Sequence, residues 1–95
     1  MSRILSLERE VEIVNQAGLH ARPAAKFVKL AESFTSSIRI EKGDLTVNGK
    51  SIMGVLMLAA ECGSHINMCA EGSDAEDALA ALADLVGQGF EEREG

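Results

Sequence analysis

A histidine precedes a proline by three positions in the segment GLHARPAA, residues 18–25, and this arrangement could support phosphoryl transfer. The neutral imidazole of His20 is a nucleophile near neutral pH. Pro23 is well tolerated in the first turn of a helix, where its missing N–H costs little. We therefore expect a helix to begin near His20, with the imidazole at the junction between loop and helix.

A helix that starts at this point would stabilise a phosphoryl group on His20. Free N–H groups and the positive end of the helix macrodipole favour an anion there, so Ala21 and Arg22 would cradle the phosphate. The guanidinium of Arg22 could also bind the phosphoryl oxygens, while Gly18 lets the loop turn sharply. A histidine at a helix start more often serves only as a cap, and the spacing alone leaves both interpretations open.

No other group of residues in the chain predicts a metal or cofactor site. The candidate ligands Cys62, His65 and Cys69 number only three, and the last two stand four residues apart on an expected strand. The two thiols have no CxxC spacing and are expected to be reduced and structural. We therefore predict neither a metal nor a cofactor.

Length, charge and hydropathy restrict the class of protein. The 95 residues suit one domain, with an ordered core at about 8–90 and an acidic tail at 91–95. The net charge of −6 argues against nucleic-acid binding, which needs clustered lysine and arginine. No apolar run approaches the ~18 residues of a membrane span, and the N-terminus lacks the apolar core of a signal peptide. We expect a cytoplasmic monomer that does not insert into membranes.

Alternating and helical patterns predict the element order βαββαβα. Strands are expected at 8–14, 37–41, 45–48 and 65–71, the second and third forming a hairpin with Leu45 and Val47 directed inward. Helices are expected from 21 to 34, from 52 to 60 after the N-cap Ser51, and from 75 to about 87 after a capping box that begins at Ser73. Met57 and Met68 are expected in the core, and Met53 on the surface. The fold class is α+β, an antiparallel sheet covered on one face by helices.

At these residues the sequence resembles the HPr family, the histidine phosphocarriers of the bacterial phosphoenolpyruvate-dependent phosphotransferase system. The resemblance continues through NGKSIMGVLML, residues 48–58, and AEG, residues 70–72. It covers the chain from about residue 8 to 90 with the same element order. It implies an open-faced β-sandwich, with four antiparallel strands under three helices.

The resemblance also implies roles for particular residues. His20 would accept a phosphoryl group on Nδ1 from phosphorylated enzyme I and pass it to EIIA-type domains, with Arg22 as the active-site arginine. Ser51 would be the serine modified by HPr kinase/phosphorylase. Ile52 and Met53 match an apolar docking patch, to which Lys29 and Lys50 would add charge. The protein would be a stoichiometric carrier rather than a stand-alone enzyme.

Some alternatives stay open at this point. Glu32 and Gly54 stand where some sugar-branch members carry a basic residue, and the acidic ending is similar to that of nitrogen-branch relatives, so the branch is undecided. Ser51 could be only a helix cap. A purely regulatory binding module is the second function, although such relatives lack the histidine that is present here. A small-phosphate hydrolase is disfavoured, because paired carboxylates and a metal cluster are missing from the sequence pattern.

Overall fold

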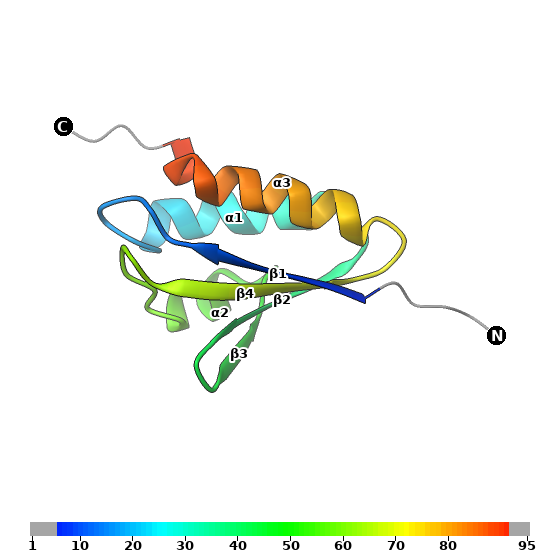
Figure 1. Cartoon of the computed structure of the whole chain (residues 1–95), viewed down its shortest axis with the longest axis horizontal. Coiled ribbons are helices and arrows are strands. Elements are labelled where there is room, and N and C mark those ends of the chain that lie inside the picture. Colours follow the sequence, from blue (N-terminus) through cyan, green and yellow to red (C-terminus); the bar gives the residue numbers. More distant parts are fainter. Residues whose placement is uncertain (1–5, 92–95) are drawn as a thin grey trace.

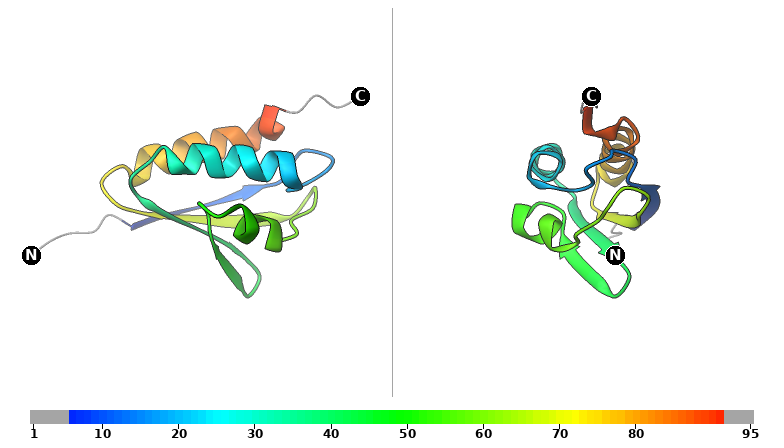
Figure 2. Two further views of the ribbon diagram at one scale, coloured as in Figure 1. Left: turned by 180° about the vertical axis from the view of Figure 1, so that it is seen from behind. Right: turned by 90° about the vertical axis from the view of Figure 1, so that its left-hand side faces the viewer.

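The computed structural model describes residues 6–91 and shows four strands and three helices in the expected βαββαβα order (Figure 1). The elements are β1 (Ser6–Glu12), α1 (Ala21–Glu32), β2 (Ser37–Lys42), β3 (Leu45–Asn48), α2 (Ile52–Met57), β4 (His65–Glu71) and α3 (Ala75–Gly87), followed by a 3₁₀ turn, η1 (Gly89–Glu91). The strand order is β1-β4-β2-β3, and every neighbouring pair is antiparallel. The helices lie on one face of the sheet, and the other face is open (Figure 2). The α+β fold class is confirmed.

An apolar core fills the space between the sheet and the helices. The inward side chains of the two central strands, among them Ile40 and Met68, are fully buried, and Phe27 of α1 packs in the same cluster. Phe90, just beyond α3, is also fully buried and closes the core at its end. Lys26 Nζ donates to the Phe90 carbonyl oxygen at 2.7 Å, which ties η1 to α1.

The open face of the sheet carries long polar side chains over a buried cysteine. Cys69 lies at the centre of β4 and is only 2% exposed. Asn67 Nδ2 donates to Glu8 Oε1 at 2.8 Å and to Glu41 Oε1 at 3.3 Å, so three strands are linked beside the thiol. Burial, followed by the nearby charges of Glu41 and Glu8, raises the pKa of the Cys69 thiol. The raised pKa favours the neutral form of this buried thiol, whereas Cys62 is exposed.

Several element ends differ from the sequence prediction. Strand β1 is displaced by two residues toward the N-terminus, and α1 ends at Glu32, two residues before Phe34. Helix α2 ends at Met57 and not at residue 60, because Ala59 adopts a φ of +49°, which a helix cannot continue through. Leu45 was expected to point inward but is 38% exposed. It lies on the edge strand beside the hairpin turn, where no helix covers the sheet (Figure 1).

The capping box predicted at the start of α3 is wrong. The N-cap residue is Asp74, not Ser73, and its carboxylate makes no hydrogen bond to its own helix. Asp74 instead accepts hydrogen bonds from the backbone N–H groups of Thr35 and Ser36, at 2.9 Å each, and from both hydroxyls. These bonds hold the α1–β2 loop against the β4–α3 loop. The hydroxyl of Ser36 and the other donors lower the pKa of Asp74 to about 2.

Candidate functional site

His20 occupies the N-cap position of α1 and is exposed. Its backbone is extended, with φ −82° and ψ −170°, and its carbonyl oxygen accepts the first helical bond from Ala24 N at 3.0 Å. The imidazole makes no capping hydrogen bond to the helix. The predicted loop-to-helix position of His20 is therefore correct, and the interpretation as a simple side-chain cap is not supported.

The N-terminus of α1 is electropositive. Pro23 is buried and lacks an N–H, so Ala21 and Arg22 supply the backbone N–H groups at the very start of the helix, and both residues are exposed. The first turn contains no acidic residue. The positive end of the helix macrodipole is therefore not neutralised locally and favours an anion beside His20.

The loop that leads to His20, residues 13–19, is held by backbone contacts. Asn15 Nδ2 donates to the Gly18 carbonyl oxygen at 2.8 Å, and Gly18 N donates to the Asn15 carbonyl oxygen at 3.1 Å. Leu19 is buried, and its N–H donates to the Ala60 carbonyl oxygen at 2.8 Å. Gly18 has a φ of +73°, which favours glycine. The histidine is therefore exposed on a loop whose backbone is fixed on both sides of Gly18.

Helix α2 carries an apolar surface. Ile52, Met53 and Met57 are 45%, 69% and 63% exposed, respectively. The prediction that Met57 is a core residue is wrong, because the six-residue helix buries only Val55. Ser51 caps this helix through its Oγ, which accepts a hydrogen bond from Gly54 N at 3.1 Å, so its predicted capping role is confirmed.

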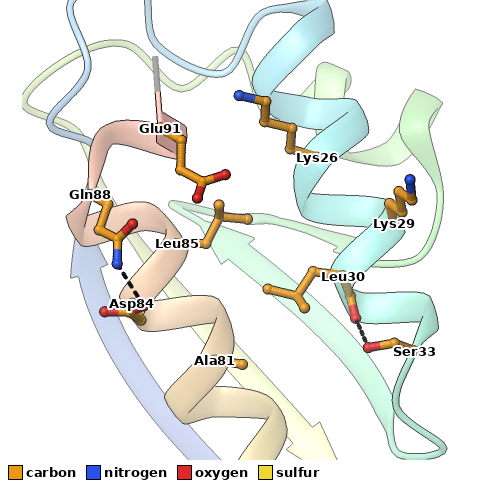
Figure 3. A pocket seen from close by; sticks show the side chains of 9 residues that line it. All are labelled: Lys26, Lys29, Leu30, Ser33, Ala81, Asp84, Leu85, Gln88 and Glu91. Atoms are coloured by element: carbon orange, nitrogen blue, oxygen red, sulfur yellow. Dashed lines mark hydrogen bonds between the residues drawn. The ribbon is translucent and has the colours of Figure 1, made fainter. Parts of the chain in front are cut away.

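The two lysines predicted to assist docking lie in different surroundings. Lys50 is half-buried, and its Nζ donates to the Phe34 carbonyl oxygen at 2.7 Å. Lys29 is exposed and lines a shallow groove of about 650 Å³ between α1 and α3 (Figure 3). The groove has a floor of Leu30, Ala81 and Leu85, and residues 20–22 are not among those that line it. This groove is therefore separate from the His20 site.

Neither a metal site nor a membrane span is found in residues 6–91. No group of three or more His, Cys, Asp and Glu side chains in this range could hold a metal ion. No helix in the same range is long and apolar enough to cross a bilayer.

Sequence reasoning did not find the role of the turn after α2. Ala59 and Ala60 are small apolar residues at a helical spacing, and nothing in their type signals a positive φ or a carbonyl that receives Leu19 N–H. The one sequence signal near this contact was Gly18. A glycine can mark an unusual backbone conformation, but it does not reveal which segment packs against it. These contacts join segments about 40 residues apart in the sequence, and only the fold shows them.

Residues 7–88 match the family model described as the PTS HPr component phosphorylation site. The chain belongs to the HPr family. The phosphocarrier protein HPr of Neisseria meningitidis serogroup A is 46% identical over 88 residues, which cover 93% of this chain and 99% of that protein. The HPr-like protein Crh of Halalkalibacterium halodurans is 50% identical over 76 residues, 80% of this chain and 90% of that protein.

A solved family structure has the same fold. The crystal structure of HPr-C-His from Thermoanaerobacter tengcongensis superposes with a TM-score of 0.88 at 46% identity, covering 93% of this chain and 99% of that chain. The open-faced architecture expected from the resemblance is therefore confirmed. The family includes both HPr and HPr-like Crh proteins at similar identity, so the relatives alone do not assign a role to each residue of this chain.

Proposed function

We propose that this protein is a phosphocarrier of the phosphotransferase system that accepts a phosphoryl group on His20 and delivers it to a second protein. The observation that carries this proposal is the exposed His20 at the start of α1, whose first turn contains no acidic residue. The match of residues 7–88 to the family's phosphorylation-site model supports it.

The chemistry is a reversible substitution at phosphorus. A neutral imidazole nitrogen of His20, Nδ1 by family resemblance, forms the N–P bond while the bond to the donor's leaving group breaks. The N–H groups of Ala21 and Arg22 and the Arg22 guanidinium stabilise the phosphoryl oxygens. The acceptor then attacks the same phosphorus and the N–P bond breaks, which restores neutral His20. Neither step requires a metal ion or a cofactor from this protein.

Partners of this relay must approach an open, exposed site. We assign enzyme I as the donor and EIIA-type domains as acceptors, and the exposed Ile52 and Met53 as the apolar part of the docking surface. Lys29 and Lys50 would add positive charge around it. The relay would operate in the cytoplasm, with the chain acting as a monomer of one domain.

The test is phosphoryl loading by enzyme I and phosphoenolpyruvate. We expect one acid-labile phosphoryl group on the parent and none on His20→Ala. The matched control is His65→Ala, which removes the other histidine, an exposed residue of β4 whose Nε2 lies 3.9 Å from Glu12 Oε1. Loading of His20→Ala at the level of the parent would remove His20 from the mechanism.

A second candidate role is regulation through Ser51. Its hydroxyl is half-buried at the start of α2, next to exposed Ile52 and Met53, so a phosphate there would place negative charge beside the docking patch. The similarity of this chain to HPr-like Crh proteins supports regulation through Ser51 as a second role. Family resemblance implies that purely regulatory members lack the histidine, and the presence of His20 therefore favours the relay as the main function, with Ser51 as a control point in hosts that have the kinase.

A further inference from the structure

Two loops that are distant in the sequence lie together at the His20 end of the molecule. The β1–α1 loop is residues 13–19, and the α2–β4 loop is residues 58–64 (Figure 1). Ile13 N donates to the Ser64 carbonyl oxygen at 2.8 Å, and Gly63 N donates to the Ile13 carbonyl oxygen at 2.7 Å. The Cys62 thiol lies 3.7 Å from the Val14 carbonyl oxygen. The α2–β4 loop thus supports the loop that leads to His20.

The residue directly before His20 makes one of the contacts between these loops. Leu19 is 4% exposed and Ala60 is 3% exposed, and the hydrogen bond from Leu19 N to the Ala60 carbonyl oxygen is 2.8 Å long. Because Leu19 precedes the N-cap, this bond fixes the direction in which the chain enters α1. It therefore constrains the backbone position of His20 at the start of α1.

The fit at this contact leaves no room for a side chain on Gly18. A Cβ atom added at Gly18 would lie 2.6 Å from the Ala60 carbonyl oxygen and 3.0 Å from Glu61 Cα, both of which are backbone atoms. Backbone atoms cannot move aside as the end of a side chain can, so the two loops would have to separate. The φ of +73° at Gly18 would add strain for any other residue.

The α2–β4 loop is itself set by local features. Ala59, with its φ of +49°, ends α2 and turns the Ala60 carbonyl toward Leu19. Ser64 Oγ accepts a hydrogen bond from Glu61 N at 3.0 Å, and Ser64 N donates to the Glu61 carbonyl oxygen at 2.9 Å. These bonds close the turn that follows Ala60. Since α2 also carries the exposed Ile52 and Met53, which are assigned to docking, the docking surface and the support of His20 belong to one continuous segment.

We propose that the α2–β4 loop positions His20 for phosphoryl transfer, with Ala60 as the positioning residue through its carbonyl oxygen and Gly18 as the residue that allows the contact. This proposal rests on the proposed phosphocarrier function. It differs from a docking role, because the contact lies inside the protein and offers no side chain to a partner. Loss of the contact should slow the chemical step without weakening the binding of the donor.

The test compares two glycine substitutions that impose similar backbone strain. In Gly18→Ala, the new methyl group meets the Ala60 carbonyl. Gly43 has a φ of +60°, but a Cβ there has nothing within 4 Å, so Gly43→Ala is the matched control. With enzyme I as donor and this protein as the varied substrate, we expect kcat for Gly18→Ala to fall about 10- to 100-fold at an unchanged KM, as expected for a small misplacement of a reacting group. Gly43→Ala should keep both values.

A second readout does not depend on phosphoryl transfer. Hydrogen exchange of the Leu19 amide, followed by NMR, should be slow in the parent and in Gly43→Ala, and at least about tenfold faster in Gly18→Ala. Parental kcat and parental Leu19 exchange in Gly18→Ala would overturn the proposal, and so would a raised KM at unchanged kcat. If the parent accepts no phosphoryl group, the proposed function fails, whereas Leu19 exchange still decides whether the contact fixes the residue before His20.

Ser64→Ala adds no atoms to the α2–β4 loop, so it tests the proposal even if Gly18→Ala does not fold. Ser64→Ala removes the acceptor for Glu61 N, and Ser64→Thr retains it. We expect Ser64→Ala to lower kcat about 2- to 10-fold, the kinetic equivalent of one neutral hydrogen bond, and Ser64→Thr to restore the parental value. Equal kcat for Ser64→Ala and the parent would count against positioning by this loop.

Discussion

Helices α1 and α3 both begin at an N-cap residue whose side chain makes no hydrogen bond to its own helix. At α3, the carboxylate of Asp74 is occupied by donors from Thr35 and Ser36, and the acidic residues Glu76 and Asp77 follow in the first turn. At α1, the N-cap is exposed His20, and no acidic residue follows. His20 and Asp74 both occupy an N-cap position, but the two helix starts differ in charge and exposure.

This difference shows what makes a helix start suitable for an anion. The macrodipole is similar at both, but the carboxylates of α3 already neutralise it, and a phosphoryl group there would be repelled. The start of α1 has positive potential, an exposed nucleophile and Arg22. A helix N-terminus alone therefore predicts little, and the absence of acidic residues beside an exposed histidine is the informative feature.

The largest effect on the fold is expected at Asp74. Asp74→Ala removes four hydrogen bonds that join the α1–β2 loop to α3. Because the folded-state pKa is about 2, below the ordinary value, the stabilisation is present above about pH 4 and is lost as the pH falls from about 4 toward 2. The measurement is the melting temperature at pH 7 and at pH 2. Asp74→Ala should melt below the parent at pH 7, and the two should converge at pH 2.

The control for Asp74 is Asp77→Asn, which removes an exposed carboxylate of the same helix turn without breaking these bonds. It should melt close to the parent at both pH values. A difference between Asp74→Ala and the parent that stays constant down to pH 2 would show that the ionised carboxylate is not the stabilising group. Phosphoryl loading at neutral pH should be unchanged in both variants, because the hydrogen bonds of Asp74 lie at the end of the molecule away from His20 (Figure 1).

Arg22→Ala is expected to give a large kinetic effect on the transfer from His20 to the acceptor. A hydrogen bond to a charged group contributes roughly 1.5–3 kcal/mol, so its loss should slow transfer to the acceptor about 10- to 100-fold. Arg22 is exposed, and the fold should be intact. Rapid-quench kinetics of transfer from the phosphorylated protein provides the measurement. The control is Arg39→Ala, an exposed arginine on the open sheet face, 3.9 Å from Glu71. Equal rates for the two variants would refute the role of Arg22.

The sequence predicted the features that depend on local patterns. The element order, the helix start at His20 and the Ser51 cap follow from periodicity and from residue types at fixed positions. The features it could not predict depend on distant partners. The predicted cap of α3 was Ser73 and not Asp74, because local sequence cannot show that Thr35 and Ser36 lie within reach of the Asp74 carboxylate. Met57 was assigned to the core because an apolar type does not reveal which face of a short helix stays uncovered.

A moderate effect is expected at Ser51, the N-cap residue of α2. Ser51→Ala removes the acceptor for Gly54 N and should cost about 1 kcal/mol of stability while leaving the loading rate near that of the parent. Ser51→Asp retains a capping oxygen but adds charge beside Ile52 and Met53, so loading by enzyme I should be much slower at unchanged stability. Initial loading rates and melting temperatures are the measurements. Thr46→Asp, on exposed β3, controls for the added charge. Parental loading of Ser51→Asp would leave Ser51 as a cap only.

The smallest effect comes from giving α1 the acidic first turn that α3 has. Ala21→Glu places a carboxylate at the exposed first residue of α1, where it should stabilise the helix by about 0.3–1 kcal/mol through the macrodipole. The same charge opposes the incoming phosphoryl group, and an equal energy in the transition state slows loading by about 2- to 5-fold. Ala80→Glu adds the same charge to an exposed position of α3 and should change neither property much. Stability and loading should therefore move in opposite directions only for Ala21→Glu. If both variants are loaded at the same rate, the missing acidic residue does not explain why the start of α1 accepts an anion, and Arg22 with the positioning of His20 must account for it.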